Sequence, residues 1–252
     1  AFAALKTDGS VVTWGQSEFG GNSSLVSSSL SRNVSAIYST QSAFAALKTD
    51  GSVVTWGQSD FGGDSSSVSS YLSSGVNVVY STQLAFAALK TDGSVVTWGY
   101  SDWGGDSSSV SSSLSSDVSV VYSNDYVFAA LKTDGSVVTW GNQYMGGHLG
   151  KIYDRVNSAW ILVSDVSSDL TSGVSKIFST GSAFAAVKTD GSVVTWGHSD
   201  RGGDSSDVSN NLTSDVSVIY SNYGAFAALK TDGSVVTWGD SGYGGDSSGI
   251  DF

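Results

Sequence analysis

The sequence has no cysteine, no proline and a single methionine among its 252 residues. Without cysteine it cannot form disulfides, thiolate metal sites or a cysteine nucleophile, and this composition is compatible with an oxidising exterior. Basic residues are also scarce: 11 Lys and Arg stand against 23 Asp and Glu, and the net charge is −12. Phosphate backbones and anionic membrane surfaces attract positive charge. We therefore expect neither nucleic acid nor a lipid surface as a partner.

Long apolar runs are missing too. The longest, such as "AFAAL" and "AWILV", have about five residues, whereas a membrane-spanning helix needs about 20. We therefore expect no membrane insertion. The chain begins inside a repeat, without an initiator methionine or a signal-peptide pattern. This start indicates a fragment or a mature piece of something longer.

One repeated string dominates what is present. "KTDGSVVTWG" occurs six times, and its tryptophan recurs every 42 residues except for one interval of 56. An insertion therefore lies at about 148–161, and the last repeat lacks its final 14 residues. A fixed period of this length is typical of propellers and solenoids. We predict a single domain over 1–252, with repeats that start at residues 1, 43, 85, 127, 183 and 225.

Each repeat reads as three short strands. The first alternates β-branched or aromatic residues with polar ones, as in "VSAIYS", and is expected at 34–39, 76–81, 118–123, 174–179 and 216–221. "AFAALK" and "SVVTWG" follow, and the Asp-Gly between them predicts a tight hairpin in which both central residues take positive φ. The Gly- and Ser-rich remainder predicts loop. Within it, Val68 and Leu72 stand four apart, so one helical turn would direct both inward.

Units of about 40 residues with three or four antiparallel strands are typical of a β-propeller, because each blade covers the next. We therefore predict an all-β propeller with six repeats in this chain. The first hairpin has no strand before it. A closing strand would come from beyond Phe252, from the terminal "GIDF" or from another chain. An open sheet edge of this kind is usually covered.

"ALKTDGSVVTWG", followed by "QSDFGG", resembles the RCC1-like repeat superfamily, and most closely its three-stranded form of the β-lactamase inhibitory protein II type. The resemblance covers the chain except the insertion. It implies a propeller, typically of seven blades, that binds proteins through the loops of one face. Here there are six repeats, "GGD" stands where Gly-Gln-Leu-Gly is common, and the frequent His before the middle strand is absent. The exchange activity of the namesake is therefore not carried over.

The invariant residues have two interpretations each. The repeated tryptophan could stack on sugars, but blade packing demands the same large residue in every repeat. The repeated aspartate could bind Ca²⁺, but its place in the turn explains it without a metal. The repeated lysine could form an anion-binding ring, or it could be a solvated strand end or a partner of residues such as Asp64. We expect the structural interpretation in all three cases, and no cofactor or metal.

Positions that differ between repeats are better candidates for binding, because loops on a rigid scaffold usually carry function. The position before Gly-Gly carries residue types that are enriched at protein interfaces. The loop before the middle strand and the position after Trp-Gly also vary. The alternative is that the residue before Gly-Gly fills a gap beneath its own blade; we favour this for Phe19 and Phe61, and exposure for Trp103 and Arg201. The candidate binding residues are Phe19, Phe61, Trp103, Met145, Arg201, Tyr243, Tyr126 and Tyr223.

The insertion carries Tyr153, Arg155 and Trp160, which are residue types common at interfaces. It is either a functional projection or inter-subunit contact, or a tolerated surface loop. Catalysis has little support, since the two histidines, His148 and His198, lie on different repeats and no catalytic motif is present.

We predict a non-enzymatic propeller, extracellular or at the cell surface, that binds a protein partner or a neighbouring subunit through loops of one face. The alternative is a structural or adhesive segment of a larger surface protein or assembly, in which the unpaired edge joins a neighbour.

Overall fold

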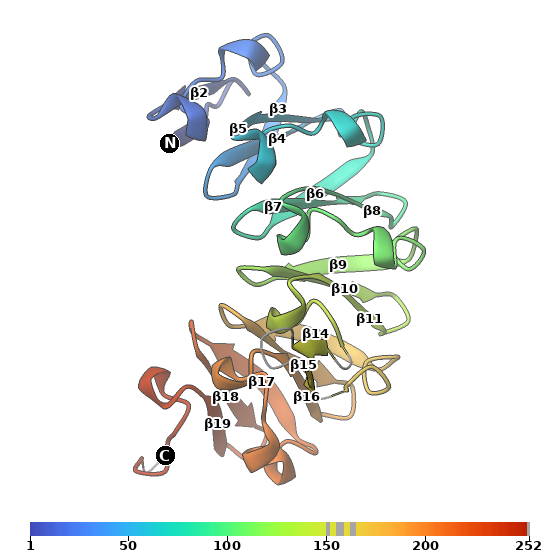
Figure 1. Ribbon diagram of the computed structural model, residues 1–252, viewed down its shortest axis with the longest axis vertical. Coiled ribbons are helices and arrows are strands. Elements are labelled where there is room, and N and C mark those ends of the chain that lie inside the picture. Colours follow the sequence, from blue (N-terminus) through green and yellow to red (C-terminus); the bar gives the residue numbers. More distant parts are fainter. Residues whose placement is uncertain (150–151, 155–158, 162–164, 251–252) are drawn as a thin grey trace. The chain divides into compact units, whose positions relative to one another are not determined.

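The computed structural model describes residues 1–149, 152–154, 159–161 and 165–250, with the backbone alone for the two short segments. Its contacts divide the chain into two compact units, Ala1–Val121 and Tyr122–Phe252. Strands and short 3₁₀ helices follow one another in the same order through the repeats, except in the incomplete first and last repeats and at the insertion (Figure 1). No helix in the described ranges is long and apolar enough to cross a membrane. The prediction of a single domain stays a prediction.

Every repeat after the first, counted from here on together with the strand that precedes its hairpin, forms a three-stranded antiparallel sheet, as the sequence predicts. The five first strands occupy the predicted ranges to the residue. In chain order the sheets are β3 (Val34–Ser39), β4 (Ala43–Lys48) and β5 (Val53–Gly57); β6 (Val76–Ser81), β7 (Ala85–Lys90) and β8 (Val95–Gly99); β9 (Val118–Ser123), β10 (Val127–Lys132) and β11 (Val137–Gly141); β14 (Val174–Ser179), β15 (Ala183–Lys188) and β16 (Val193–Gly197); and β17 (Val216–Ser221), β18 (Ala225–Lys230) and β19 (Val235–Gly239).

The first repeat has only the hairpin of β1 (Phe2–Leu5) and β2 (Val11–Trp14), so the strand missing from the sequence is also missing from the sheet. The insertion adds a two-stranded hairpin, β12 (Ile152–Asp154) and β13 (Ala159–Ile161). An all-β fold built from three-stranded antiparallel blades is thereby confirmed.

The Asp-Gly turn differs from the predicted one. Only the glycine takes positive φ, +77° at Gly9, and Asp8 does not. The amide of Gly9 donates to the carbonyl of Lys6 at 3.0 Å, and the amide of Lys6 donates to Ser10 at 2.8 Å. This is a turn followed by one glycine in the left-handed region, the common three-residue hairpin loop. Asp8 stabilises it by accepting from both the amide and the hydroxyl of Ser10.

The middle strand can be buried on both faces because its residues are small. In β4, Phe44 and Ala46 face the preceding blade, while Ala43, Ala45 and Leu47 face the following one. Alanine lets neighbouring sheets approach closely. The phenylalanine stacks on the tryptophan of the same blade, with ring centroids 5.2 Å apart for Phe44 and Trp56.

The repeated tryptophan is a core residue between blades in five of its six copies. The indole nitrogens of Trp56, Trp98 and Trp238 donate to a glycine carbonyl of the preceding repeat at 3.0–3.1 Å. That of Trp196 is buried without a hydrogen-bond partner among the described residues. Trp14, in the first repeat, is half exposed. The interpretation as blade packing is therefore confirmed, and Trp14 differs because no blade of the described chain covers it.

The loop predicted after the third strand contains short 3₁₀ helices. In the second repeat, the amide of Leu72 reaches back to the carbonyl of Val68, Leu72 is fully buried and Val68 partly so. The predicted inward helical turn is therefore present. The 3₁₀ helices are Ser17–Phe19, Ser24–Val26, Ser59–Phe61, Ser66–Val68, Ser101–Trp103, Ser108–Val110, Gln143–Met145, Ser199–Arg201, Ser206–Asn211 and Ser241–Tyr243.

Candidate binding face

The variable loops of each complete repeat are joined by one recurring side-chain hydrogen bond. The residue after the first strand donates to the main-chain carbonyl of the residue before Gly-Gly, 21 positions further on. The five bonds measure 2.7–3.1 Å and run from Thr40 to Phe61, Thr82 to Trp103, Asn124 to Met145, Thr180 to Arg201 and Asn222 to Tyr243. The sequence held a signal for this contact, since the loop begins with Thr or Asn each time, but sequence reasoning treated the whole loop as variable.

The position after Trp-Gly joins the same surface. Its amide donates to the carbonyl of the residue just before the middle strand, as from Tyr100 to Leu84 at 3.0 Å and from Asp240 to Gly224 at 3.0 Å. All three variable positions of a repeat therefore lie at one end of its blade. We call this end the loop face. The sequence predicted such a face, and the hydrogen bonds show what holds it together.

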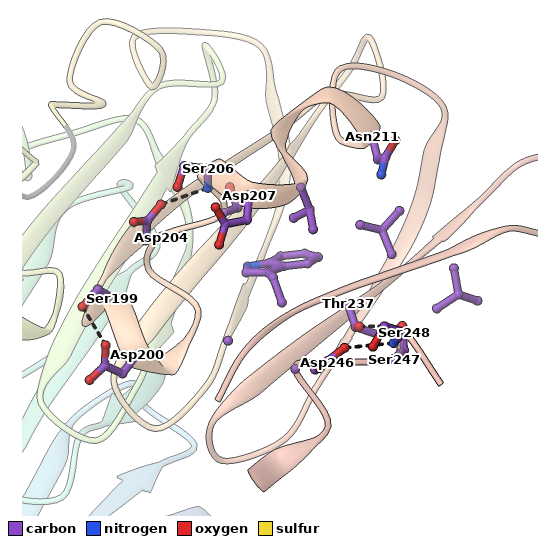
Figure 2. Close-up of a pocket in the computed structure, with 17 residues that line it drawn as sticks. Ser199, Asp200, Asp204, Ser206, Asp207, Asn211, Thr237, Asp246, Ser247 and Ser248 are labelled. Carbon is purple, nitrogen blue, oxygen red and sulfur yellow. Dashed lines mark hydrogen bonds between the residues drawn. The ribbon is translucent and has the colours of Figure 1, made fainter. Parts of the chain in front are cut away.

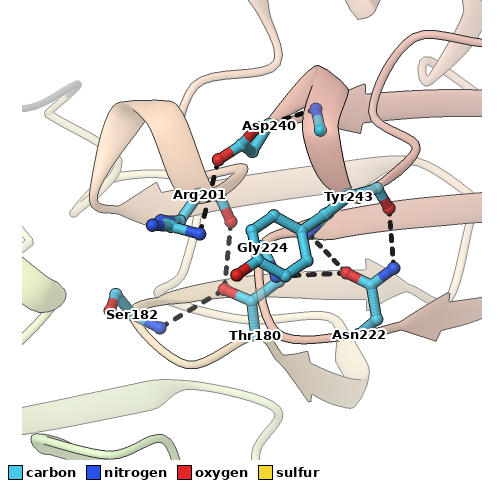
Figure 3. Close-up of polar contacts among 9 residues, drawn as sticks. Thr180, Ser182, Arg201, Asn222, Gly224, Asp240 and Tyr243 are labelled. Carbon is cyan, nitrogen blue, oxygen red and sulfur yellow. Dashed lines mark hydrogen bonds and ion pairs between the residues drawn. The ribbon is translucent and has the colours of Figure 1, made fainter.

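In the second unit the loop face carries a cluster of Arg201, Tyr223 and Tyr243. The guanidinium carbon lies 5.4 Å from the Tyr223 ring centroid and 5.1 Å from that of Tyr243. Such cation–π contacts stabilise by roughly 0.5–2 kcal/mol. Nη1 of Arg201 also lies 3.4 Å from Oδ2 of Asp240 (Figure 3). Because Arg201 is held on three sides, it is half-buried and not exposed as the sequence suggested.

The two tyrosines of this cluster form its exposed surface. Tyr223 is 50% exposed and Tyr243 is 43% exposed. A Cβ on Gly181 would lie 2.7 Å from the Tyr223 ring, and one on Gly224 would lie 2.8 Å from the Tyr243 ring. The glycines therefore let the rings lie flat against the backbone. Large, rigid aromatic faces with little rotamer entropy to lose suit protein recognition.

In the first unit the loop face carries Phe61, Tyr100 and Trp103. The Tyr100 ring meets Phe61 edge-on at 6.1 Å and Trp103 edge-on at 6.2 Å. Phe61 and Trp103 are half-buried, so the expected contrast between a filled gap and an exposed side chain is absent. Tyr100 occupies the variable position after Trp-Gly, and the structure brings its ring between the other two.

The remaining predicted residues are half-buried on their loops or lie in the insertion. Phe19, Met145 and Tyr126 are each half-buried on their loops. Burial, with smaller effects from Tyr223 and Asp125, raises the pKa of Tyr126, so its hydroxyl stays protonated at neutral pH. In the insertion, the backbones of Tyr153 and Trp160 pair across the hairpin. Their side chains, and Arg155, lie outside the described residues.

An acidic groove follows the edge between neighbouring blades. One groove of about 600 Å³ is lined by Asp200, Asp204, Asp207 and Asp246, and an equivalent one of about 540 Å³ lies in the first unit (Figure 2). Its carboxylates serve local turns: Asp204 accepts from the Ser206 amide and Asp246 from the Ser248 amide, each at 2.9 Å. Within the described residues no group of three or more His, Asp or Glu is arranged to hold a metal ion.

In the repeats where their contacts are seen, the repeated lysines lie at strand ends and do not pair with residues such as Asp64. Lys90, Lys188 and Lys230 each donate to a main-chain carbonyl 19 positions earlier, at 2.9–3.0 Å. Lys6 pairs with Asp8 at 3.3 Å. The ammonium groups of Lys90, Lys188 and Lys230 therefore hold the loop at the end of the blade opposite the loop face.

Comparison with known proteins identifies the fold. No protein-family model matches the sequence, and no curated protein matches it. Among solved structures, Prp20p from Saccharomyces cerevisiae, studied with its binding to Gsp1p and histones, superposes with a TM-score of 0.51 and 18% identity, over 82% of this chain and 57% of that one. The structure of Kap60 bound to yeast RCC1 (Prp20) gives 0.50 and 16%, over 82% and 56%. The chain has an RCC1-like β-propeller fold.

At this identity the likeness concerns the fold alone. The chain also spans little more than half the length of the propellers it matches.

Proposed function

We propose that this RCC1-like propeller is a non-enzymatic protein-binding module that recognises its partner with the loop face. One observation carries the proposal: in each complete repeat, the recurring hydrogen bond from Thr or Asn ties the loop before the middle strand to the residue before Gly-Gly, so that the variable positions of that repeat are preorganised. Preorganisation lowers the entropy lost on binding. The side chains so presented are tyrosine, tryptophan and arginine, which dominate the energetics of interfaces.

We further propose that the chain belongs to the three-stranded form of the superfamily, of the β-lactamase inhibitory protein II type; the three strands of every complete blade support this assignment. We also propose an extracellular or cell-surface location, which the cysteine-free, acidic composition supports. Nucleic acid is a poor partner for a chain of net charge −12. Imaging of the tagged full-length protein in intact and permeabilised cells tests the location.

The test of binding uses a matched pair of surface variants. The double variant Tyr223→Ser/Tyr243→Ser removes the exposed rings of the loop face. Tyr71→Ser removes an exposed tyrosine at the opposite end of its own blade, where Lys90 donates to the Tyr71 carbonyl. A partner captured with the wild-type chain is purified and its Kd is measured by calorimetry against all three proteins.

We expect the loop-face variant to weaken Kd about 100-fold or more, as loss of central aromatic residues does at hot spots. The Tyr71→Ser variant is expected to bind like wild type. Equal binding by all three proteins, or loss with Tyr71→Ser alone, would contradict the use of the loop face. Turnover of a substrate that is lost in a His198→Ala variant would contradict the non-enzymatic assignment.

A further inference from the structure

The loop face of the first unit carries aromatic rings and carboxylates next to one another in the sequence. Tyr100 is 39% exposed, and its ring lies edge-on to those of Phe61 and Trp103, at 6.1 and 6.2 Å. Asp60 directly precedes Phe61 and Asp102 directly precedes Trp103 on the short 3₁₀ helices, and both aspartates are exposed. We call these five residues the Tyr100 site.

The carboxylates of the Tyr100 site have no cation from their own unit. Neither Asp60 nor Asp102 forms an ion pair within the described part of the chain. The loop face lies where a first strand ends, whereas the basic residues come just before a first strand begins or where a middle strand ends. These basic residues of the first unit are Lys6, Arg32, Lys48 and Lys90. They therefore belong to the end of the blades opposite the loop face.

The second unit shows how the loop face holds a cation. Arg201 occupies the position before Gly-Gly, and its guanidinium carbon lies 5.4 Å from the Tyr223 ring centroid and 5.1 Å from that of Tyr243. Asp240, at the position after Trp-Gly, lies 3.4 Å from Nη1 of this arginine (Figure 3). Two aromatic rings and one carboxylate therefore bind a guanidinium on this face.

The same positions carry other residues in the first unit. Phe61 stands at the position of Arg201, and Tyr100 stands at that of Asp240. Aromatic rings and carboxylates are thus present in the first unit, but the guanidinium is replaced by a phenyl ring. A guanidinium from another molecule would restore the combination that the second unit makes with its own arginine.

We propose that the Tyr100 site binds an arginine side chain of the protein partner. The inference rests on the proposed function of the loop face, and it names the chemistry of the partner. The guanidinium packs on the exposed ring of Tyr100 and pairs with the carboxylates of Asp60 and Asp102. The face of an aromatic ring attracts a cation, and the net charge of −12 draws a basic partner toward the chain.

The probe is a fluorescein-labelled peptide of three Gly-Arg-Ser repeats. Its control peptide carries citrulline, which keeps the shape of arginine without the charge. Fluorescence anisotropy measures the binding of both peptides to the full chain at about 0.15 M salt, where attraction between distant exposed charges is screened. Wild type is expected to bind the arginine peptide about tenfold more tightly than the citrulline peptide.

Removal of the ring tests the aromatic part of the site. Tyr100→Gln introduces the residue that the second repeat carries at this position, Gln58, so the local fold already accommodates it. Tyr100→Phe keeps the ring, and Tyr71→Ser removes an exposed tyrosine at the opposite end of a blade. We expect Tyr100→Gln to weaken binding of the arginine peptide about fivefold, while Tyr100→Phe and Tyr71→Ser bind like wild type.

Removal of the carboxylates tests the ionic part. Asp60→Asn/Asp102→Asn takes two charges from the site. Asp169→Asn/Asp207→Asn takes the same charge from exposed side chains outside the loop face, since the Asp169 carbonyl accepts from a repeated lysine and Asp207 lines the groove between blades. The first pair is expected to weaken binding about fivefold, and the second to leave it within about twofold of wild type.

Three results would overturn the proposal. They are undetectable binding of the arginine peptide by wild type, equal binding of the arginine and citrulline peptides, and equal losses in the site variants and their controls. Circular dichroism melts of all variants establish that each one folds.

This outcome is separable from the test of the loop face as a whole. The captured partner is compared with variants of Tyr223 and Tyr243, which lie in the second unit. If that double variant loses the partner while the arginine and citrulline peptides bind alike, the loop face binds proteins and the Tyr100 site does not select a cation.

Discussion

At the scale of single residues, identical side chains fix geometry and differing ones provide a surface. Asp8 and its five copies each accept two hydrogen bonds from the serine two positions on. A carboxylate that accepts hydrogen bonds is favoured in its ionised form. The hydroxyl and the amide of Ser10 hold the pKa of Asp8 at about 2, and the equivalent serines lower the pKa of Asp50, Asp92, Asp134, Asp190 and Asp232.

This repeated pKa shift predicts how stability depends on pH. Because the folded pKa lies below the unfolded value of 3.8, the contribution is present above pH 3.8 and is lost as pH falls through the folded pKa. We expect the melting temperature to be level near neutral pH and to fall between about pH 4 and pH 2. Circular dichroism melts at several pH values measure it.

The control is Asp134→Asn, which removes one of the six carboxylates. This variant is expected to lose less stability than wild type over the same acid range, because it has one fewer group to protonate. An identical loss in both proteins would show that the turn aspartates are not responsible.

At the scale of the element, the same tryptophan has different roles according to its neighbour. Trp98 is buried, stacks on Phe86 at 5.2 Å and donates to the carbonyl of Gly62 at 3.1 Å. Trp14 makes the same kind of stack, on Phe2 at 5.4 Å, but is half exposed. The sequence alone assigns both tryptophans the same role. Their burial shows that Trp98 packs between blades and that Trp14 does not.

Truncation of the two tryptophans therefore has unequal costs. We expect Trp98→Ala to lower the free energy of unfolding by about 3–5 kcal/mol, as for a fully buried aromatic residue. Trp14→Ala is expected to cost about 1 kcal/mol or less, because little surface is uncovered. Urea denaturation at a concentration where the chain is monomeric compares them. Equal costs would contradict the difference in burial.

At the scale of the whole molecule, repeats differ in how many neighbours support them. Stability in repeat architectures is approximately a sum of repeat terms and interface terms. The first repeat has two strands, and its Phe2, Val12 and Trp14 are exposed. The second has three strands and a core cluster shared with the first repeat.

Hydrogen exchange is expected to show this difference. Amides of β1 and β2 should exchange earlier than those of β4 and β5, because opening the first repeat exposes less apolar surface. Mass spectrometry of peptides covering 2–14 and 44–56 measures it in monomeric chain. Equal exchange of both peptides in the monomer would contradict the interpretation.

Periodicity determined most of the fold. Six copies of one string, five of them preceded by an alternating strand, predicted the fold class and the ranges of five strands, because a repeated pattern allows one local solution. The predicted type of the Asp-Gly turn was wrong. Asp-Gly occurs in both two-residue and three-residue hairpin loops, and only the backbone φ of the aspartate distinguishes them. The lysine contacts were also missed, since main-chain carbonyls carry no sequence signature.

The sequence predicted the positions of the candidate site, and the structure added the contacts between their side chains. Variation between repeats pointed to Arg201, Tyr223 and Tyr243, but nothing in the sequence places an arginine between two tyrosines from the next repeat. The sequence by itself determined the blades, their strands and the loops that vary. Only the tertiary structure decided which variable side chains meet, that Arg201 is half-buried, and that Trp14 is exposed where five identical tryptophans are buried. The physical reason is that burial depends on the neighbour a repeat receives, and identical sequences can receive different neighbours.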